Sequence, residues 1–317
     1  MRRRGAITFL LGTAVLPVAA WAQPVKSARL GVLVTADPEP FLGLLRDGLR
    51  SYGYVEGKNL QIELRSAQGK PDLLPVLAAE LVRGKVDVLV AWQTPAVQAA
   101  KQATREIPIV MSAGDPVGTG LVASLARPGG NITGVTGTTA VMAAKTIELI
   151  REMLPAAKRL AILANAADSF TRVFVEQIEQ AGRAVALDIH TFPVRRVEEF
   201  DAAFAQMGKL KTDVVVVQPS LPRPPAISLA LKYRLPSVSA TPAFPGAGGL
   251  LSYSARAAEM YRGTAGYVDK ILKGAKPADL PVQQASTFEL VINLKTAKAL
   301  GVTIPRVLLQ RADKLIE

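Results

Sequence analysis

The apolar positions of this chain alternate between short continuous runs and stretches with a helical period. Residues 30–34 form a short apolar run, typical of a parallel strand that is buried on both faces. Residues 41–53 place apolar side chains at helical spacing between charged ones and end at Gly53, a residue that suits a helix C-terminus. The alternation continues with strands expected at 60–64, 86–91 and 107–111 and helices at 73–83 and 95–104. It predicts a parallel sheet covered by helices on both faces.

The second half of the chain repeats this pattern. Strands are expected at 160–164, 184–191, 214–217 and 236–239, and helices at 170–181, 197–207 and 226–232. Three pairs of similar segments recur at nearly the same separation: 29–37 with 159–168, 86–92 with 212–218, and 107–111 with 235–239. The duplication predicts an α/β fold of two similar doubly wound parallel-sheet lobes. Clefts between such lobes are frequent sites for small molecules.

Three extended segments are placed to cross between the lobes, at 131–136, 248–253 and 288–293. A long helix at 257–272 precedes the third crossing, and a helix at 294–300 follows it. We therefore expect one lobe from 23–135 plus 254–285 and the other from 136–253 plus 286–317. The crossings predict a three-segment hinge near Gly134–Gly137, Ser252–Ser254 and Ala285–Thr287, about which a ligand closes the lobes.

The N-terminus has the composition of a secretory signal peptide. Arg2–Arg4 precede an apolar stretch at 6–18, and Ala20-Trp21-Ala22 has the small-x-small pattern that signal peptidase reads. The apolar stretch is shorter than the roughly 20 residues that a membrane-spanning helix needs. We expect a signal peptide at 1–22, cleavage before Gln23, and a mature protein in the periplasm.

Composition narrows the classes of function. The chain has no cysteine, which excludes disulfides and thiolate chemistry. Its net charge is +12, but the basic residues are dispersed and aromatic residues make up only 5%, so nucleic acid is not an expected partner. The single histidine, His190, belongs to no metal-binding cluster, and no phosphate-loop, zinc-protease or hydrolase motif occurs. We expect no enzyme activity, no cofactor and no metal.

Four longer segments carry a family resemblance, at 48–59, 114–134, 267–281 and 288–301. In them the chain resembles the tryptophan/tyrosine-type ABC transporter substrate-binding proteins, which have the type I periplasmic-binding fold. The resemblance covers essentially the whole mature chain. It implies a monomeric periplasmic receptor that captures a small amino-acid-like ligand, aromatic ones included, and delivers it to an ABC permease in the inner membrane.

Ligands of doubly wound sheets bind outside the carboxyl ends of strands, beside helix N-termini. This rule selects loops whose candidate ligand-binding residues are Thr35, Ala36, Trp92, Gln93, Thr94, Pro95, Asn165 and Ser169. Thr94 is expected as N-cap and Pro95 as first helical residue, so that the following amides face a ligand carboxylate. Asp168 is expected to cap its helix rather than to contact the ligand.

Three further candidates have two roles each. Asp115 either pairs with a ligand ammonium or caps a helix that includes 117–125. Ser220 occupies a position where relatives often carry Asp, beside the Pro-rich insertion 222–225. This protein therefore need not share the ligand of those relatives. Tyr253 either closes over the ligand or packs in the hinge, and Tyr253 or Trp92 would stack on an aromatic ligand.

These residues lead to one hypothesis and two alternatives. The hypothesis is an α-amino acid ligand whose carboxylate lies at the Thr94 helix start and whose ammonium lies at Asp115. One alternative is a periplasmic sensor for a membrane signalling partner. The other, an exported enzyme, is disfavoured by the missing catalytic residues.

Overall fold

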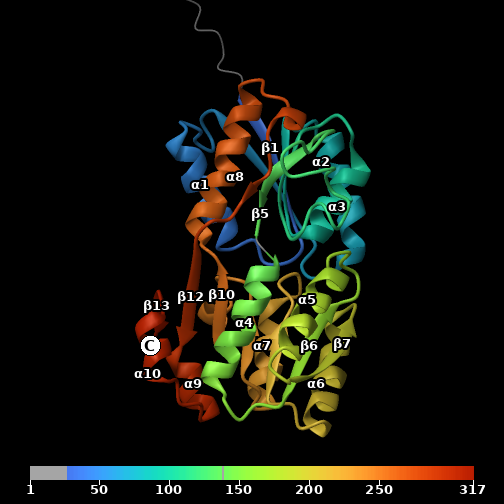
Figure 1. Ribbon diagram of the computed structural model, residues 1–317. Coiled ribbons are helices and arrows are strands. Elements are labelled where there is room, and N and C mark those ends of the chain that lie inside the picture. Colours follow the sequence, from blue (N-terminus) through green and yellow to red (C-terminus); the bar gives the residue numbers. More distant parts are fainter. Residues whose placement is uncertain (1–26, 138) are drawn as a thin grey trace, which may run out of the picture.

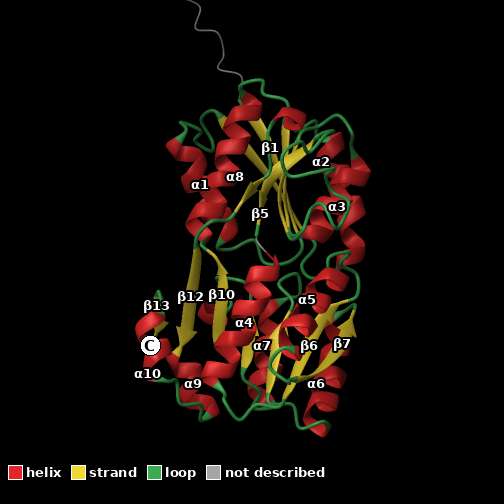
Figure 2. Cartoon of the chain, viewed as in Figure 1, coloured by secondary structure: helices red, strands yellow, loops and turns green. Residues whose placement is uncertain are grey.

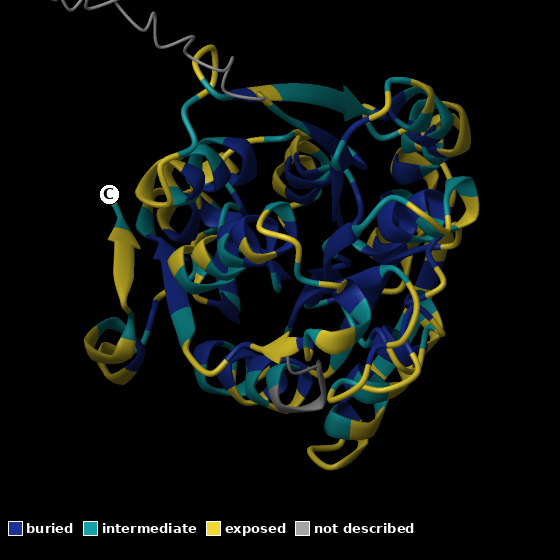
Figure 3. Ribbon diagram, turned by 90° about the horizontal axis from the view of Figure 1, so that it is seen from above, coloured by how far each residue is buried: buried dark blue, intermediate teal, exposed yellow. Residues whose placement is uncertain are grey.

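The computed structural model describes residues 27–137 and 139–317, with no side chains described at 139–141. The expected signal peptide and its cleavage site lie outside the described residues. The described chain forms two α/β lobes, one above the other in Figure 1, each built around its own sheet (Figure 2). Buried positions follow the sheets and the inner helix faces, whereas exposed positions follow the outer loops (Figure 3).

The first lobe is organised around a six-stranded sheet with the order β11-β5-β4-β3-β1-β2. Its strands pair in parallel throughout and are β1 (Ala28–Val34), β2 (Leu60–Ser66), β3 (Val88–Trp92), β4 (Ile109–Ala113), β5 (Ile132–Thr136) and β11 (Gln283–Gln284). Helices α1 (Phe41–Ser51) and α8 (Ala257–Leu272) cover one face, and α2 (Leu74–Arg83) and α3 (Thr94–Ala103) cover the other. In β1, Val32 packs under α1 and α8 while Leu33 packs under α2 and α3, which explains the continuous apolar run.

The second lobe is organised around a seven-stranded sheet with the order β13-β12-β10-β9-β8-β6-β7. Its strands are β6 (Arg159–Asn165), β7 (Asp188–Val194), β8 (Val214–Val217), β9 (Ser237–Ser239), β10 (Leu251–Ala255), β12 (Phe288–Asn293) and β13 (Lys314–Ile316). Only the β10–β12 pair within the described part of this sheet is antiparallel. One face is covered by α4 (Thr139–Met153), α5 (Thr171–Arg183), α9 (Leu294–Leu300) and α10 (Arg306–Arg311), and the other by α6 (Phe200–Lys209) and α7 (Arg223–Lys232).

The chain passes between the lobes after β5, between β10 and α8, and between β11 and β12 (Figure 1). These crossings are tied to one another. The Arg256 N–H donates to the Thr287 carbonyl at 3.0 Å, and the Ala285 N–H donates to the Thr136 carbonyl at 2.8 Å. Glu259 at the start of α8 accepts the Thr287 N–H at 3.1 Å. The three crossings therefore form one hydrogen-bonded bundle.

Close to the first crossing, β5 needs a glycine. Gly134 has φ +140 and lies opposite Met111 in the β4–β5 register. A Cβ at Gly134 would lie 2.6 Å from the Met111 backbone nitrogen and closer still to its carbonyl oxygen. The two strands can approach in this way only because residue 134 has no side chain.

The predicted type I two-lobe fold is confirmed, and several elements have the predicted bounds. These are the helix at 257–272, the strands at 214–217 and 288–293, and the helix at 294–300. Each has either a helical period or a short apolar run, patterns that tertiary contacts rarely override.

Other expected elements are corrected. The helix expected at 117–125 is wrong, because residues 116–120 form turns and both Leu121 and Val122 donate back to the Pro116 carbonyl. The strand expected from residue 184 begins at Asp188, because α5 runs on to Arg183. The insertion at 222–225 opens α7, where prolines cost no hydrogen bond. Helix α4 was not expected. No helix among the described residues is long and apolar enough to cross a membrane.

Candidate ligand-binding site

A cavity of about 180 Å³ lies between the two lobes, at the carboxyl ends of the central strands. The first lobe contributes the ends of β3 and β4 and the first turns of α3 and α8. The second contributes the segments after β6, β8 and β9 and the inner faces of α4 and α5. This is the edge at which doubly wound folds bind ligands.

Aromatic rings line both sides of the cavity. On the first lobe, Trp92 stacks on Phe41 with ring centroids 4.6 Å apart, and Tyr261 meets the edge of Trp92 at 6.1 Å. On the second lobe, Phe170 and Phe174 lie 6.0 Å apart. Burial raises the pKa of Tyr261 strongly, so its hydroxyl stays neutral. The walls favour a ligand with a large apolar group.

Asp168 brings a carboxylate to the cavity wall and is 6% exposed. Its Oδ2 accepts the Ser220 hydroxyl at 2.6 Å and the Gln218 amide at 2.9 Å, and its Oδ1 accepts the Phe170 N–H at 2.9 Å. The Asn165 amide donates in turn to the Ser220 hydroxyl at 3.1 Å. Burial raises the pKa of Asp168 despite these bonds. The expected helix-capping role is correct in part, because Asp168 caps the turn before α5, which itself begins at Thr171.

Hydroxyl groups complete the polar lining. Ser112, Thr146 and Ser254 line the cavity from β4, α4 and β10, and all are buried. The Ser254 hydroxyl is fully enclosed and has no hydrogen-bond partner among the described residues. An unpaired buried hydroxyl of this kind costs free energy.

The start of α3 differs from the expectation. Gln93, with φ +74, is the N-cap, and Thr94 is the first helical residue, so the assignment of Thr94 as N-cap is wrong. Thr94 is 2% exposed and lines the cavity together with Trp92 and Gln93. The start of this helix therefore borders the cavity, but the helix begins one residue earlier than expected.

Several candidate residues lie in the seam between the lobes rather than at the cavity. Thr35, Pro95 and Asn165 border a much smaller pocket of about 20 Å³, which Ser220 shares with the main cavity. The Thr35 hydroxyl donates to the Gln93 side-chain oxygen.

The remaining candidates border neither pocket. The Ala36 carbonyl accepts the Ser66 hydroxyl, Ser169 is exposed, and Tyr253 stacks on Phe288 at 5.7 Å. Asp115 accepts the Gly118 N–H at 2.9 Å within its own turn. Its carboxylate thus caps a turn and not the expected helix.

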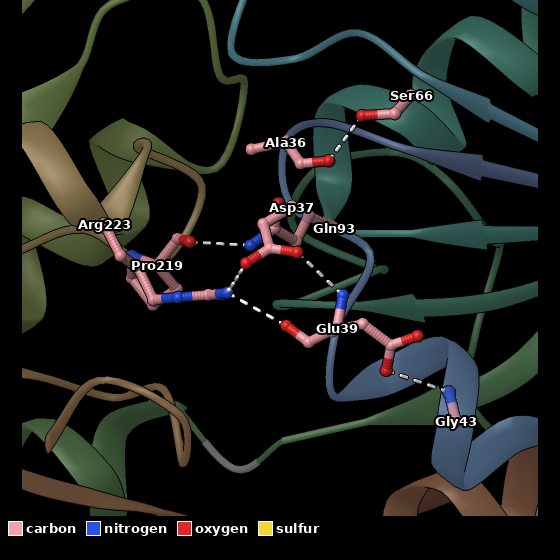
Figure 4. A network of polar contacts seen from close by, with 8 residues as sticks. All are labelled: Ala36, Asp37, Glu39, Gly43, Ser66, Gln93, Pro219 and Arg223. Carbon is pink, nitrogen blue, oxygen red and sulfur yellow. Dashed lines mark hydrogen bonds and ion pairs between the residues drawn. The ribbon is translucent and has the colours of Figure 1, made fainter. Parts of the chain in front are cut away.

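The two lobes also touch through the polar contacts drawn in Figure 4, which are called the cleft-mouth contacts below. Arg223 at the start of α7 forms an ion pair with Asp37 at 3.1 Å and donates to the Glu39 carbonyl at 3.0 Å. The Gln93 amide donates to the Pro219 carbonyl at 2.6 Å. These bonds join loops of the first lobe to the second lobe through residues that lie outside the three crossings.

Sequence reasoning missed Asp168, Ser254, Tyr261 and the inner faces of α4 and α5 as cavity residues. Asp168 follows β6, so the strand-end rule could have included it. The others lie on helix faces and on a crossing strand. Their apolar spacing is the same whether such a face packs on a core or borders a cavity.

Comparison with known proteins fits this geometry. Residues 41–316 match the family described as "ABC transporter substrate binding protein". A curated "Tyrosine-binding protein" of Clostridioides difficile (strain R20291) is 27% identical over 259 residues, which are 80% of this chain and 74% of that protein.

Two solved structures share both sequence and fold. A "conserved domain protein" from Vibrio cholerae is 31% identical with a TM-score of 0.84. An "ABC domain in complex with L-Trp" from Streptococcus pneumoniae is 30% identical with a TM-score of 0.83. Each comparison covers 92% of this chain and 100% of the other. Two lobes around a cavity, joined by three crossings, define the class of type I periplasmic-binding proteins. Within that class, the chain belongs to the ABC transporter substrate-binding protein family.

Proposed function

We propose that this protein captures an amino acid with a large apolar side chain between its lobes and delivers it to an ABC permease. The observation that supports this most is the cavity itself, with aromatic walls from both lobes and isolated polar groups between them. A relative named as a tyrosine-binding protein and one solved in complex with L-Trp support the same class of ligand. The protein acts by binding and performs no reaction.

Capture works by closure of the two lobes about the three crossings. The ion pair and hydrogen bonds across the cleft mouth join the lobes through residues outside the three crossings and form only when the lobes are together. The ligand carboxylate lies at the start of α3, where Thr94 and the positive end of the helix favour an anion. The protein works as a monomer.

Purified protein is expected to be stabilised by L-tryptophan, L-tyrosine or another large apolar amino acid. A ligand at 100 times its dissociation constant adds about 2.7 kcal/mol to the free energy of unfolding. Differential scanning fluorimetry over the amino acids, followed by calorimetry, measures this. Small polar amino acids are the control, because they leave the aromatic walls unfilled. A screen in which no amino acid raises the unfolding temperature contradicts the proposal.

We further propose that the protein acts in the periplasm after loss of residues 1–22. The basic start, the short apolar stretch and Ala20-Trp21-Ala22 support this. Edman sequencing of protein from the periplasmic fraction is expected to begin at Gln23. An intact Met1, or a location in the membrane pellet, would show that the segment is retained.

A further inference from the structure

The cavity presents a buried carboxylate with no cationic side chain to balance it. Apart from Asp168, Tyr261 is the lining residue with a titratable group, and no lysine, arginine or histidine lines the described cavity. Asp168 takes part in no ion pair among the described residues, and its three hydrogen bonds come from neutral donors. The residues without described side chains, 138–141, are Thr, Thr, Ala and Val. No side chain described at this cavity therefore carries a positive charge.

An unpaired carboxylate in an apolar cavity is costly, and a positive charge brought by the occupant removes much of the cost. Asp168 is held in place by Ser220, Gln218 and the Phe170 N–H, so it cannot turn away to solvent.

We infer that Asp168 is the counter-ion of an ammonium group on the ligand and determines specificity for cationic or zwitterionic ligands over acids. The inference rests on the proposed function in so far as both concern the same cavity, and it extends to amines that lack a carboxylate. It moves the ammonium site from Asp115 to Asp168. Asp115 lies outside the cavity, and its carboxylate accepts a hydrogen bond from the Gly118 N–H.

Matched triads of ligands test the inference. L-tryptophan, tryptamine and indole-3-propionate share one ring system and differ in the ammonium and the carboxylate, as do L-tyrosine, tyramine and 3-(4-hydroxyphenyl)propionate. Calorimetry on the wild-type protein is expected to show the ammonium-bearing compounds of a triad binding about 10- to 100-fold more tightly than the acid. Asp168→Asn is expected to weaken these compounds by a similar factor and to leave the acid unchanged or tighter. Asp115→Asn, the matched control, changes none of the three.

A pH series provides a second readout that needs no variant. A nearby ammonium lowers the pKa of Asp168, which burial raises in the empty cavity. Amine binding therefore releases a proton, and affinity falls as the pH drops through the pKa of the empty site. Tyr261, the other titratable group at the cavity, stays neutral at these pH values because burial raises its pKa.

The possible outcomes separate the two proposals. Amines that bind while amino acids do not would contradict the amino-acid function and uphold Asp168 as the counter-ion. Amino acids that bind the wild-type and Asp168→Asn proteins equally would support the amino-acid function and contradict the role of Asp168 as the counter-ion. Acids that bind as tightly as amines, equal losses for all three compounds, or a panel in which no cationic compound binds would overturn the inference.

Discussion

Replacing Gly134 by alanine is expected to destabilise the protein by more than about 4 kcal/mol, an exceptional value for one methyl group. Gly134 has φ +140, which a residue with a side chain rarely adopts, and its missing Cβ makes room for the Met111 backbone. Backbone atoms of a central strand cannot move aside as a flexible side chain can. The added methyl group must therefore separate β4 from β5.

Thermal unfolding of Gly134→Ala and Gly53→Ala forms the matched comparison. Gly53 also has positive φ, +87, but nothing lies within 4 Å of the position that its Cβ would occupy. Alanine at residue 53 is therefore expected to cost only about 1–2 kcal/mol. Gly134→Ala should lower the unfolding temperature by about 10 °C or more, or yield no folded protein. Equal shifts for the two variants would show that the approach of β4 and β5 is not tight.

Arg223→Glu is expected to weaken ligand binding on the order of a hundredfold, because like charges brought together cost several kcal/mol. The variant places two carboxylates together, at Asp37 and at residue 223, across the cleft mouth. Residue 223 does not line the cavity, so the effect acts through closure. When fewer molecules reach the closed state, apparent affinity falls in proportion.

Lys232 on the same helix provides a control variant, and Asp37, the partner of Arg223, provides a compensating variant. Lys232→Glu alters another cation of α7, one that pairs with Asp201 inside the second lobe. It is expected to leave affinity unchanged. Combining Asp37→Lys with Arg223→Glu restores opposite charges and should recover much of the affinity. Small-angle scattering should show ligand-induced compaction of the wild-type protein and less of it in Arg223→Glu. Wild-type affinity in Arg223→Glu would mean that the cleft-mouth contacts contribute nothing to closure.

Much of the fold could be predicted because local pattern and tertiary role agree in it. The strand at 214–217 is a run of valines buried on both faces, and the helix at 257–272 keeps one apolar face for the first sheet. The failures have local causes. The segment at 117–125 contains Gly118 and Gly120, and Gly120 takes φ +68, which no helix accommodates.

Less of the candidate site than of the fold could be predicted from the sequence. The rule that ligands lie at strand ends led to Trp92, Thr94 and Ser220, which border the cavity. It also led to Thr35 and Ala36, because adjacent loops at one sheet edge look alike in sequence. Which of these loops faces the cavity is decided by the contact between the lobes. Local capping patterns at Asp115 and Asp168 are similar too. Each caps a local turn, and only the packing of the lobes leaves Asp168 at the cavity and Asp115 outside it.

The return of the chain to its first lobe has a consequence for the order of folding. Helix α8 packs against α1, β3, β4 and β5, and β11 completes the sheet, yet both come after most of the second lobe in the chain. During synthesis, the apolar face formed by Leu45, Leu49 and their neighbours therefore has no cover until residues 257–284 have been made. The second lobe waits still longer, for β12 and β13. Neither lobe can complete its sheet before the later crossings have been made, so the two cores are expected to form together.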